Sequence, residues 1–187
     1  FLAASDNSDW STLIVGTSGC ESEYDFVNLG AKIGKKIGKD SDIKLVQKAK
    51  DLDIYSIEFG LAISTYSFDE FKSEKSSVIN FKVINSEYSE EIQDKIRSVF
   101  WVRDMVNYPA LTKSPEFFQE KVEDLVNDLD INLTIFDEKW ISENNMGGVA
   151  GVAQGSERSP KFLIGEYNPK AKKQIALIGK GVLFDSG

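Results

Sequence analysis

The sequence has 187 residues, of which 41% are hydrophobic and 28% are charged. This length and composition are typical of a globular protein with one large or two small domains and an apolar core. The formal net charge of −8 disfavours nucleic acid or an anionic membrane surface as the main partner. No run approaches the ~18 apolar residues of a membrane span and no signal-peptide pattern opens the chain, so we expect no membrane association.

Two residue types narrow the possible chemistry. Histidine is absent from the sequence, which excludes Ser-His-Asp and Cys-His nucleophiles and every zinc site with histidine ligands. Metal chemistry would then use carboxylates, carbonyls, water or a lysine amine, which binds a metal only when it is neutral. The single cysteine, Cys20, excludes an internal disulfide and favours a reducing cytoplasm. We expect it to pack rather than to act as a catalytic thiol.

The first half of the sequence alternates predicted strands and helices. A short buried strand is expected at residues 13–15, then a turn at Gly16–Gly19 that lacks the full dinucleotide-binding fingerprint. A helix is expected from Tyr24 to Ile37. Glycines recur at every fourth position along it and predict close backbone approach to a neighbouring element. These glycines are Gly30, Gly34 and Gly38.

Three further elements are predicted before the middle of the chain. A strand is expected at Ile43–Val46 and a helix from Ile54 to Phe71. The stretch Val78–Ile84 alternates apolar and polar residues, the period-two pattern of a half-buried strand.

The second half opens with two predicted helices. Apolar residues on one face predict a long helix from Glu90 to Asn107, which Pro109 ends. Ser114 as N-cap and Pro115 at the first helical position predict the start of the next helix. Alternating residues at 131–136 predict a strand.

The last third combines a glycine-rich segment with two predicted strands. The segment Met146–Ser156 is expected to form a tight structural loop rather than an anion-binding nest, because Arg158 is its only basic companion. Strands are expected at Phe162–Ile164 and Ile175–Ile178. The second is continuously apolar, which is typical of a central strand covered on both faces.

The alternation of strands and helices predicts the α/β class. We expect an N-terminal α/β domain with a mixed sheet at residues 1–88, incomplete at its start, and the truncated beginning of a second α/β domain at 89–187. The boundary is placed within Ser86–Glu91.

The candidate chemistry lies at the end of the sequence. Gly179-Lys180-Gly181 does not fit a phosphate-binding loop, because Gln174 stands where the earlier glycine is required and Gly181 replaces the Ser or Thr. Lys180 follows a predicted central strand and Asp185 comes one short loop later, where open α/β sheets place active sites. On the residues alone, a surface lysine and an Asp-Ser-Gly turn explain this pair better than a site does.

A family resemblance changes that balance. The segment Gly179–Gly187 closely resembles the first metal-binding motif of the leucine aminopeptidase (cytosol aminopeptidase) family of two-metal enzymes. Other stretches resemble the family in the same order along the chain. They are Val102–Pro109, Met146-Gly-Gly, Val152–Ser156 continuing to Pro160, the strand ending at Tyr167 and, less specifically, Gly60–Phe68.

The resemblance implies a metalloexopeptidase of the cytoplasm that removes leucine-like N-terminal residues from peptides as a homo-hexamer. It implies that Lys180 binds one metal through its neutral amine and that Asp185 bridges two divalent ions, zinc or manganese with magnesium as a further option. The family's other metal carboxylates, its catalytic lysine and its arginine would lie beyond Gly187. We therefore expect no catalytic residue in this chain, no activity of the chain alone and no ordered pair of metals.

Two alternatives remain open. One is a non-catalytic assembly or binding module related to the N-terminal domain of the family, although the net charge of −8 weakens a version that binds DNA. The other is an unrelated nucleotide-binding domain, which requires the resemblance to be accidental.

Overall fold

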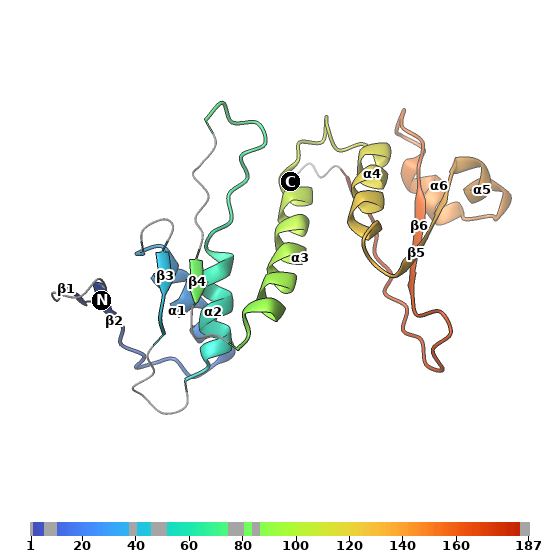
Figure 1. Ribbon diagram of the computed structural model, residues 1–187. Helices are drawn as coiled ribbons and strands as arrows, with labels where there is room; N and C mark the ends of the chain where they lie inside the picture. The colour runs from blue at the N-terminus through green and yellow to red at the C-terminus, as the bar shows by residue number, and fades with distance from the viewer. Residues whose placement is uncertain are drawn as a thin grey trace. The chain divides into compact units, whose positions relative to one another are not determined.

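The structure is a computed structural model that describes residues 2–5, 11–37, 41–45, 52–74, 81–83 and 87–183 (Figure 1). The chain forms two compact units, Phe1–Asp104 (unit 1) and Met105–Gly187 (unit 2). Helices and short strands alternate in both units, so the predicted α/β class is confirmed. The predicted domain boundary after residue 88 stays a prediction.

Unit 1 is built around two helices, α1 (Glu23–Gly34) and α2 (Ile54–Ile63). Ser22 starts α1 through a capping box, in which its hydroxyl accepts from the Asp25 N–H and the Asp25 carboxylate accepts from the Ser22 N–H. Asp53 starts α2 by accepting a 2.9 Å hydrogen bond from the Ser56 N–H. Each helix therefore begins where a short polar side chain satisfies its unpaired N–H groups.

The end of α2 differs from the prediction. We expected the helix to continue to Phe71, but it ends at Ile63. The hydroxyls of Ser64 and Thr65 donate to the carbonyls of Leu61 and Ala62 at 2.6 and 2.9 Å, which satisfies acceptors in the last turn. These two hydroxyl residues terminate the helix before the apolar pattern ends.

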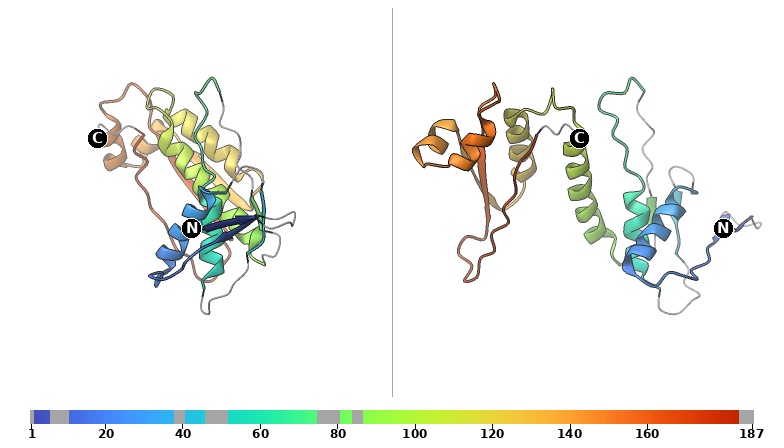
Figure 2. Two further views of the ribbon diagram at one scale, coloured as in Figure 1. Left: turned by 90° about the vertical axis from the view of Figure 1, so that its left-hand side faces the viewer. Right: turned by 180° about the vertical axis from the view of Figure 1, so that it is seen from behind.

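Glycines set the distance between α1 and α2, which lie side by side in two views (Figures 1 and 2). A Cβ atom at Gly30 would lie 2.0 Å from the Ile57 carbonyl oxygen, and one at Gly60 would lie 1.9 Å from the Val27 carbonyl oxygen. Backbone therefore packs on backbone, and only glycine fits at these two positions. The predicted close approach is confirmed for Gly30 and Gly34, while Gly38 lies outside the described residues.

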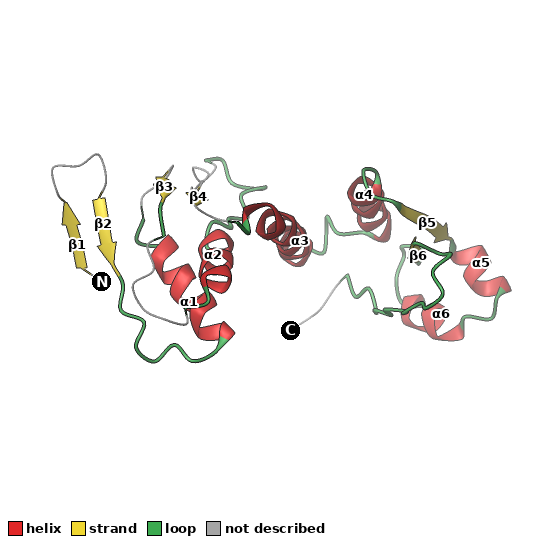
Figure 3. Cartoon of the chain, turned by 60° about the horizontal axis from the view of Figure 1, so that its bottom comes forward, coloured by secondary structure: helices red, strands yellow, loops and turns green. Residues whose placement is uncertain are grey.

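The core of unit 1 forms where these helices meet the strands. Antiparallel β1 (Leu2–Ser5) and β2 (Ser11–Ile14) pair with each other, as Figure 3 shows, and β3 (Ser41–Ile43) pairs in parallel with β4 (Phe81–Val83). Val46, residues 78–80 and Ile84 of the predicted strands lie outside the described residues. The buried cluster consists of Phe26, Leu29, Ile33, Ile43, Ile57 and Leu61.

The long predicted helix is confirmed as α3 (Ser89–Asn107). Ile92 and Ile96 are buried, as their spacing on one face predicts. The division between the units falls inside this helix, after Asp104.

Unit 2 begins its own elements with α4 (Pro115–Val126), whose predicted cap is confirmed by a 3.0 Å hydrogen bond from the Phe117 N–H to the Ser114 hydroxyl. The strands β5 (Ile131–Phe136) and β6 (Phe162–Tyr167) form an antiparallel pair, and α5 (Glu138–Glu143) lies between them in sequence. Trp140 stacks on Phe136 with ring centroids 3.8 Å apart. This contact fixes α5 against the strand pair.

The glycine-rich segment is a helix rather than the predicted loop. Residues Gly147–Ala153 form α6. Asn145 adopts a left-handed conformation with φ of 54°, which turns the chain after α5. The Met146 carbonyl then accepts from the N–H groups of Val149 and Ala150, both at 3.1 Å, and starts the helix. The loop prediction was wrong because this start uses backbone groups and has no side-chain cap.

The predicted central strand Ile175–Ile178 is also not formed. Ile175, Leu177 and Ile178 are 89%, 95% and 96% exposed, and the segment is irregular. A central strand requires strands on both sides for its N–H and C=O groups and cover for both apolar faces. The described part of the chain supplies neither to this segment, so its sequence pattern and its structure disagree.

Among the described residues, none of the helices combines the length and the hydropathy needed to cross a bilayer.

The glycine contact predicts the first mutational effect. Gly60→Ala should lower the free energy of unfolding of unit 1 by about 1–3 kcal/mol, because the added methyl group collides with the Val27 backbone. Urea unfolding followed by circular dichroism measures this change. Gly16→Ala is the matched control, since a Cβ there meets nothing within 4 Å. An unchanged midpoint for Gly60→Ala would contradict the close packing of α1 on α2.

The exposed apolar segment predicts a second result. Brief digestion of the 187-residue chain with chymotrypsin should cut after Leu177 well before it cuts after Leu61, which is 1% exposed. Mass spectrometry of the first products identifies the sites. Initial cleavage within α2, with the bond after Leu177 intact, would show that residues 175–178 are protected.

Candidate functional site

The predicted metal ligand Lys180 lies in the irregular segment after β6. Its side chain is exposed, and its carbonyl accepts a 3.0 Å hydrogen bond from the Val182 N–H. A Cβ at the neighbouring Gly179 or Gly181 would meet nothing within 4 Å, so open space surrounds the lysine backbone. Asp185, the second predicted ligand, lies outside the described residues. The two predicted ligands are therefore not brought together by the part of the chain that the structure describes.

Metal donors are also sparse elsewhere. No group of three or more cysteine, aspartate or glutamate side chains suited to a metal ion occurs among residues 2–5, 11–37, 41–45, 52–74, 81–83 and 87–183. One exposed amine cannot hold a pair of divalent ions, which need several oxygen or nitrogen donors each. The described residues can supply part of a metal site, but they do not form a complete one.

Arg158, in the family-like stretch Val152–Pro160, contacts the turn just after the family-like stretch Val102–Pro109. Its guanidinium donates to the carbonyls of Ala110 and Leu111 at 3.3 and 3.0 Å. The loop that follows α6 is thereby tied to the turn that follows α3. The sequence presents Arg158 only as the basic residue that accompanies the glycine-rich segment, and no local sequence signal indicates its two backbone partners.

A second contact that the sequence did not reveal lies in unit 1. The Tyr66 hydroxyl donates to the Asp104 carboxylate at 2.9 Å, and the Arg103 guanidinium lies 5.2 Å from the centre of the Tyr66 ring. Arg103 also donates to the Ile63 carbonyl at 3.4 Å. These contacts fix the end of α2 and the chain after it to α3. The only available signal was that Gly60–Phe68 and Val102–Pro109 both resemble one family.

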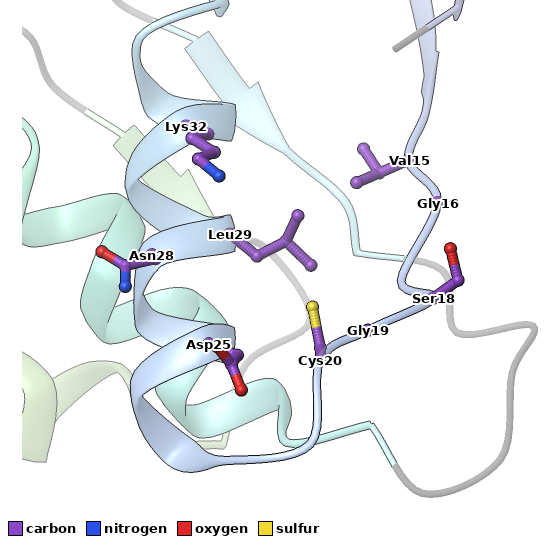
Figure 4. A pocket seen from close by; sticks show the side chains of 9 residues that line it. All are labelled: Val15, Gly16, Ser18, Gly19, Cys20, Asp25, Asn28, Leu29 and Lys32. Carbon is purple, nitrogen blue, oxygen red and sulfur yellow. The ribbon is translucent and has the colours of Figure 1, made fainter.

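A pocket of about 340 Å³ lies beside α1 in unit 1 (Figure 4). One wall is the helix face that carries Asp25, Leu29 and Lys32, and the other is the loop Val15–Cys20. Hydrogen bonds from the Ser22 hydroxyl and from the Glu21 and Ser22 N–H groups hold the pKa of Asp25 below its usual range. Cys20 is half-buried against the core of unit 1, in agreement with its expected packing role.

Comparison with known proteins relates the chain to one family. Residues 100–187 match the model of the cytosol aminopeptidase family, catalytic domain. A probable cytosol aminopeptidase of Leifsonia xyli is 34% identical over 139 residues, which cover 68% of this chain and 28% of the relative. That of Rickettsia bellii is 31% identical over 144 residues, covering 70% and 29%.

Solved structures show a related fold. A structure of the bottromycin maturation enzyme BotP in complex with Mn has a TM-score of 0.70 at 19% identity and covers 81% of this chain and 35% of that one. The cytosol aminopeptidase of Coxiella burnetii has a TM-score of 0.64 at 18% identity, covering 80% and 32%.

The chain spans about three tenths of the length of the curated relatives that it matches. The matched segment contains α4, the β5–β6 pair and the stretch that ends in the Lys180 motif. Through this segment, the chain belongs to the cytosol aminopeptidase family.

Proposed function

We propose that the chain is part of a metal-dependent aminopeptidase that hydrolyses leucine-like N-terminal residues from peptides. The observation that carries the proposal is the match of residues 100–187 to the catalytic-domain model, because this segment includes both predicted metal ligands. The names of the relatives support peptide substrates with a free N-terminus and a cytoplasmic location. Assembly as a hexamer rests on the family resemblance alone.

Two residues of this chain would hold metal in the complete site. Lys180 would contribute an amine that has lost its proton, and Asp185 would contribute a carboxylate with two oxygens able to bridge two ions. A bound pair of divalent ions supplies an acidified water and polarises the scissile carbonyl. Manganese is a candidate for these ions together with zinc and magnesium, because the related BotP structure is a complex with Mn. The remaining ligands and the catalytic lysine and arginine would come from sequence outside this chain.

The alternative of a non-catalytic assembly or binding module applies best to unit 1. The family's catalytic-domain model matches from residue 100 onwards, whereas unit 1 ends at Asp104 and has a buried cluster of its own. This alternative concerns what unit 1 binds and is compatible with a peptidase role for the segment that follows it.

Replacement of the two ligands tests the proposal in the complete gene product. Lys180→Met and Asp185→Asn should each lower kcat for leucyl-p-nitroanilide by about 1000-fold or more, because several kcal/mol of transition-state stabilisation depends on the metals. Lys172→Met, which removes a charge from another exposed lysine of the same segment, should leave kcat unchanged. Full activity of both ligand variants would refute the assigned roles.

The 187-residue chain alone should bind metal weakly. Calorimetric titration with Mn²⁺ or Zn²⁺ should show no tight binding of two ions, because two side chains leave both coordination spheres incomplete. The double variant Lys180→Met/Asp185→Asn should give the same weak isotherm. Tight binding with a stoichiometry of two ions per chain would contradict this expectation and show that the chain alone completes both coordination spheres.

A further inference from the structure

Two glycines line the loop wall of the pocket beside α1. The loop wall contains Gly16 and Gly19, and a Cβ at either position would meet nothing within 4 Å. Gly19 has φ of +86°, and the turn is closed by a 3.1 Å hydrogen bond from the Cys20 N–H to the Thr17 carbonyl. A volume of about 340 Å³ is within the range of small-molecule sites.

Opposite charges lie on the helix wall of this pocket. Asp25 is held in place by the capping box, and its three hydrogen bonds from Glu21 and Ser22 all go to Oδ2. Within the described chain no donor reaches Oδ1, so one oxygen is available to a ligand. Lys32 lies seven residues further along the helix, a rise of roughly 10 Å. The pocket therefore presents an anion and a cation. After the hydrogen bonds from Ser22 and Glu21, the Lys32 charge is a further, smaller cause of the lowered pKa of Asp25.

The space between the two charges is apolar. Leu29 extends from α1 and Val15 from the loop, and their side chains point toward each other with the Cys20 thiol beside them (Figure 4). Leu29 is buried and Val15 is half-buried. An apolar ligand group placed here would be removed from water on both sides.

The charge distribution disfavours a phosphate. The first turn of α1 contains the acidic residues Glu23 and Asp25, and the Ser22 hydroxyl already accepts from the Asp25 N–H. Phosphate binding at a helix start needs free N–H groups and a positive local field. At this helix, the charges of Glu23 and Asp25 make the local field less positive, and the Asp25 N–H group already has a partner.

We propose that this pocket binds a small zwitterion, an apolar amino acid or a dipeptide that begins with one, with its ammonium group on Asp25, its carboxylate on Lys32 and its apolar side chain beside Leu29 and Val15. Two extended residues with a charge-assisted hydrogen bond of about 2.8 Å at each end reach roughly 13 Å, and a single amino acid with the same bonds reaches roughly 9 Å. Both lengths are close to the rise between Asp25 and Lys32, and the long, exposed Lys32 side chain accommodates either ligand. This site lies in unit 1 and does not depend on the proposed peptidase function.

Titration of the ¹⁵N-labelled 187-residue chain with the dipeptide Leu-Gly tests the proposal by NMR. Amide shifts should concentrate in residues 15–32, with a Kd of about 1 mM or tighter. N-acetyl-Leu-Gly lacks the ammonium group and Leu-Gly-amide lacks the carboxylate, so each should bind at least about 5-fold more weakly. Free leucine keeps both charges and the apolar side chain, so it should also bind at this site. Shifts located elsewhere, or equal affinity of Leu-Gly and the blocked dipeptides, would overturn the assignment.

Two variants with a matched control separate the pocket from bulk charge. Lys32→Gln should weaken Leu-Gly binding by about 5–10-fold, and Gly16→Val should weaken it by filling the pocket without a backbone clash. Lys36→Gln removes the same charge from an exposed residue outside the pocket and should bind as the unchanged chain does. Circular dichroism confirms that each variant is folded. Equal binding by Lys32→Gln and Gly16→Val, or equal weakening by Lys36→Gln, would refute the site.

Discussion

The close contact between α1 and α2 is the constraint on which unit 1 depends. Because Gly30 and Gly60 each face a backbone carbonyl of the other helix, the two helices approach more closely than side chains would allow. This approach buries Leu61 and Ile57 against Phe26, Leu29 and Ile33 and gives a small unit a continuous core. It also fixes the face of α1 that forms the pocket wall, so the glycine positions influence both stability and the proposed ligand site.

Unit 2 is stabilised differently. Among its described side chains, Met105 and Ile141 are the buried hydrophobic residues, and of these Ile141 is fully buried, while Leu111, Leu125, Val152 and Tyr167 remain exposed. Local interactions hold its elements together. They are the Ser114 helix cap, the antiparallel β5–β6 pair, the Phe136–Trp140 ring stack and the Arg158 hydrogen bonds. Such interactions define local structure, but burial of apolar surface supplies most of the free energy of folding. We therefore expect unit 2 to exchange its amide hydrogens faster than unit 1 does.

Sequence patterns predicted the elements whose causes are local. Ser114 and Pro115 mark the start of α4, and alternation at residues 131–136 gives β5, because caps and two-residue periodicity act within a few residues. The pattern failed for Ile175–Ile178, where strand formation depends on partners that the described chain does not provide. It also missed α6, which starts on a backbone carbonyl. In the candidate site, Lys180 and Asp185 were identified through resemblance, whereas the partners of Arg158 and Tyr66 lie 38 to 48 residues away and have no local signal.

The exposed segment 175–178 links folding to the proposed chemistry. Lys180 follows it by two residues, so under the proposed function the direction of the lysine would become fixed if Ile175–Ile178 joined a sheet. In water, a lysine amine keeps its proton and does not bind a metal. Burial of the strand would bring the amine next to the other ligands, and the charge of the divalent ions would then favour loss of the proton. Strand formation and metal binding are therefore expected to be thermodynamically coupled: conditions that leave residues 175–178 exposed should also leave the site without its amine ligand.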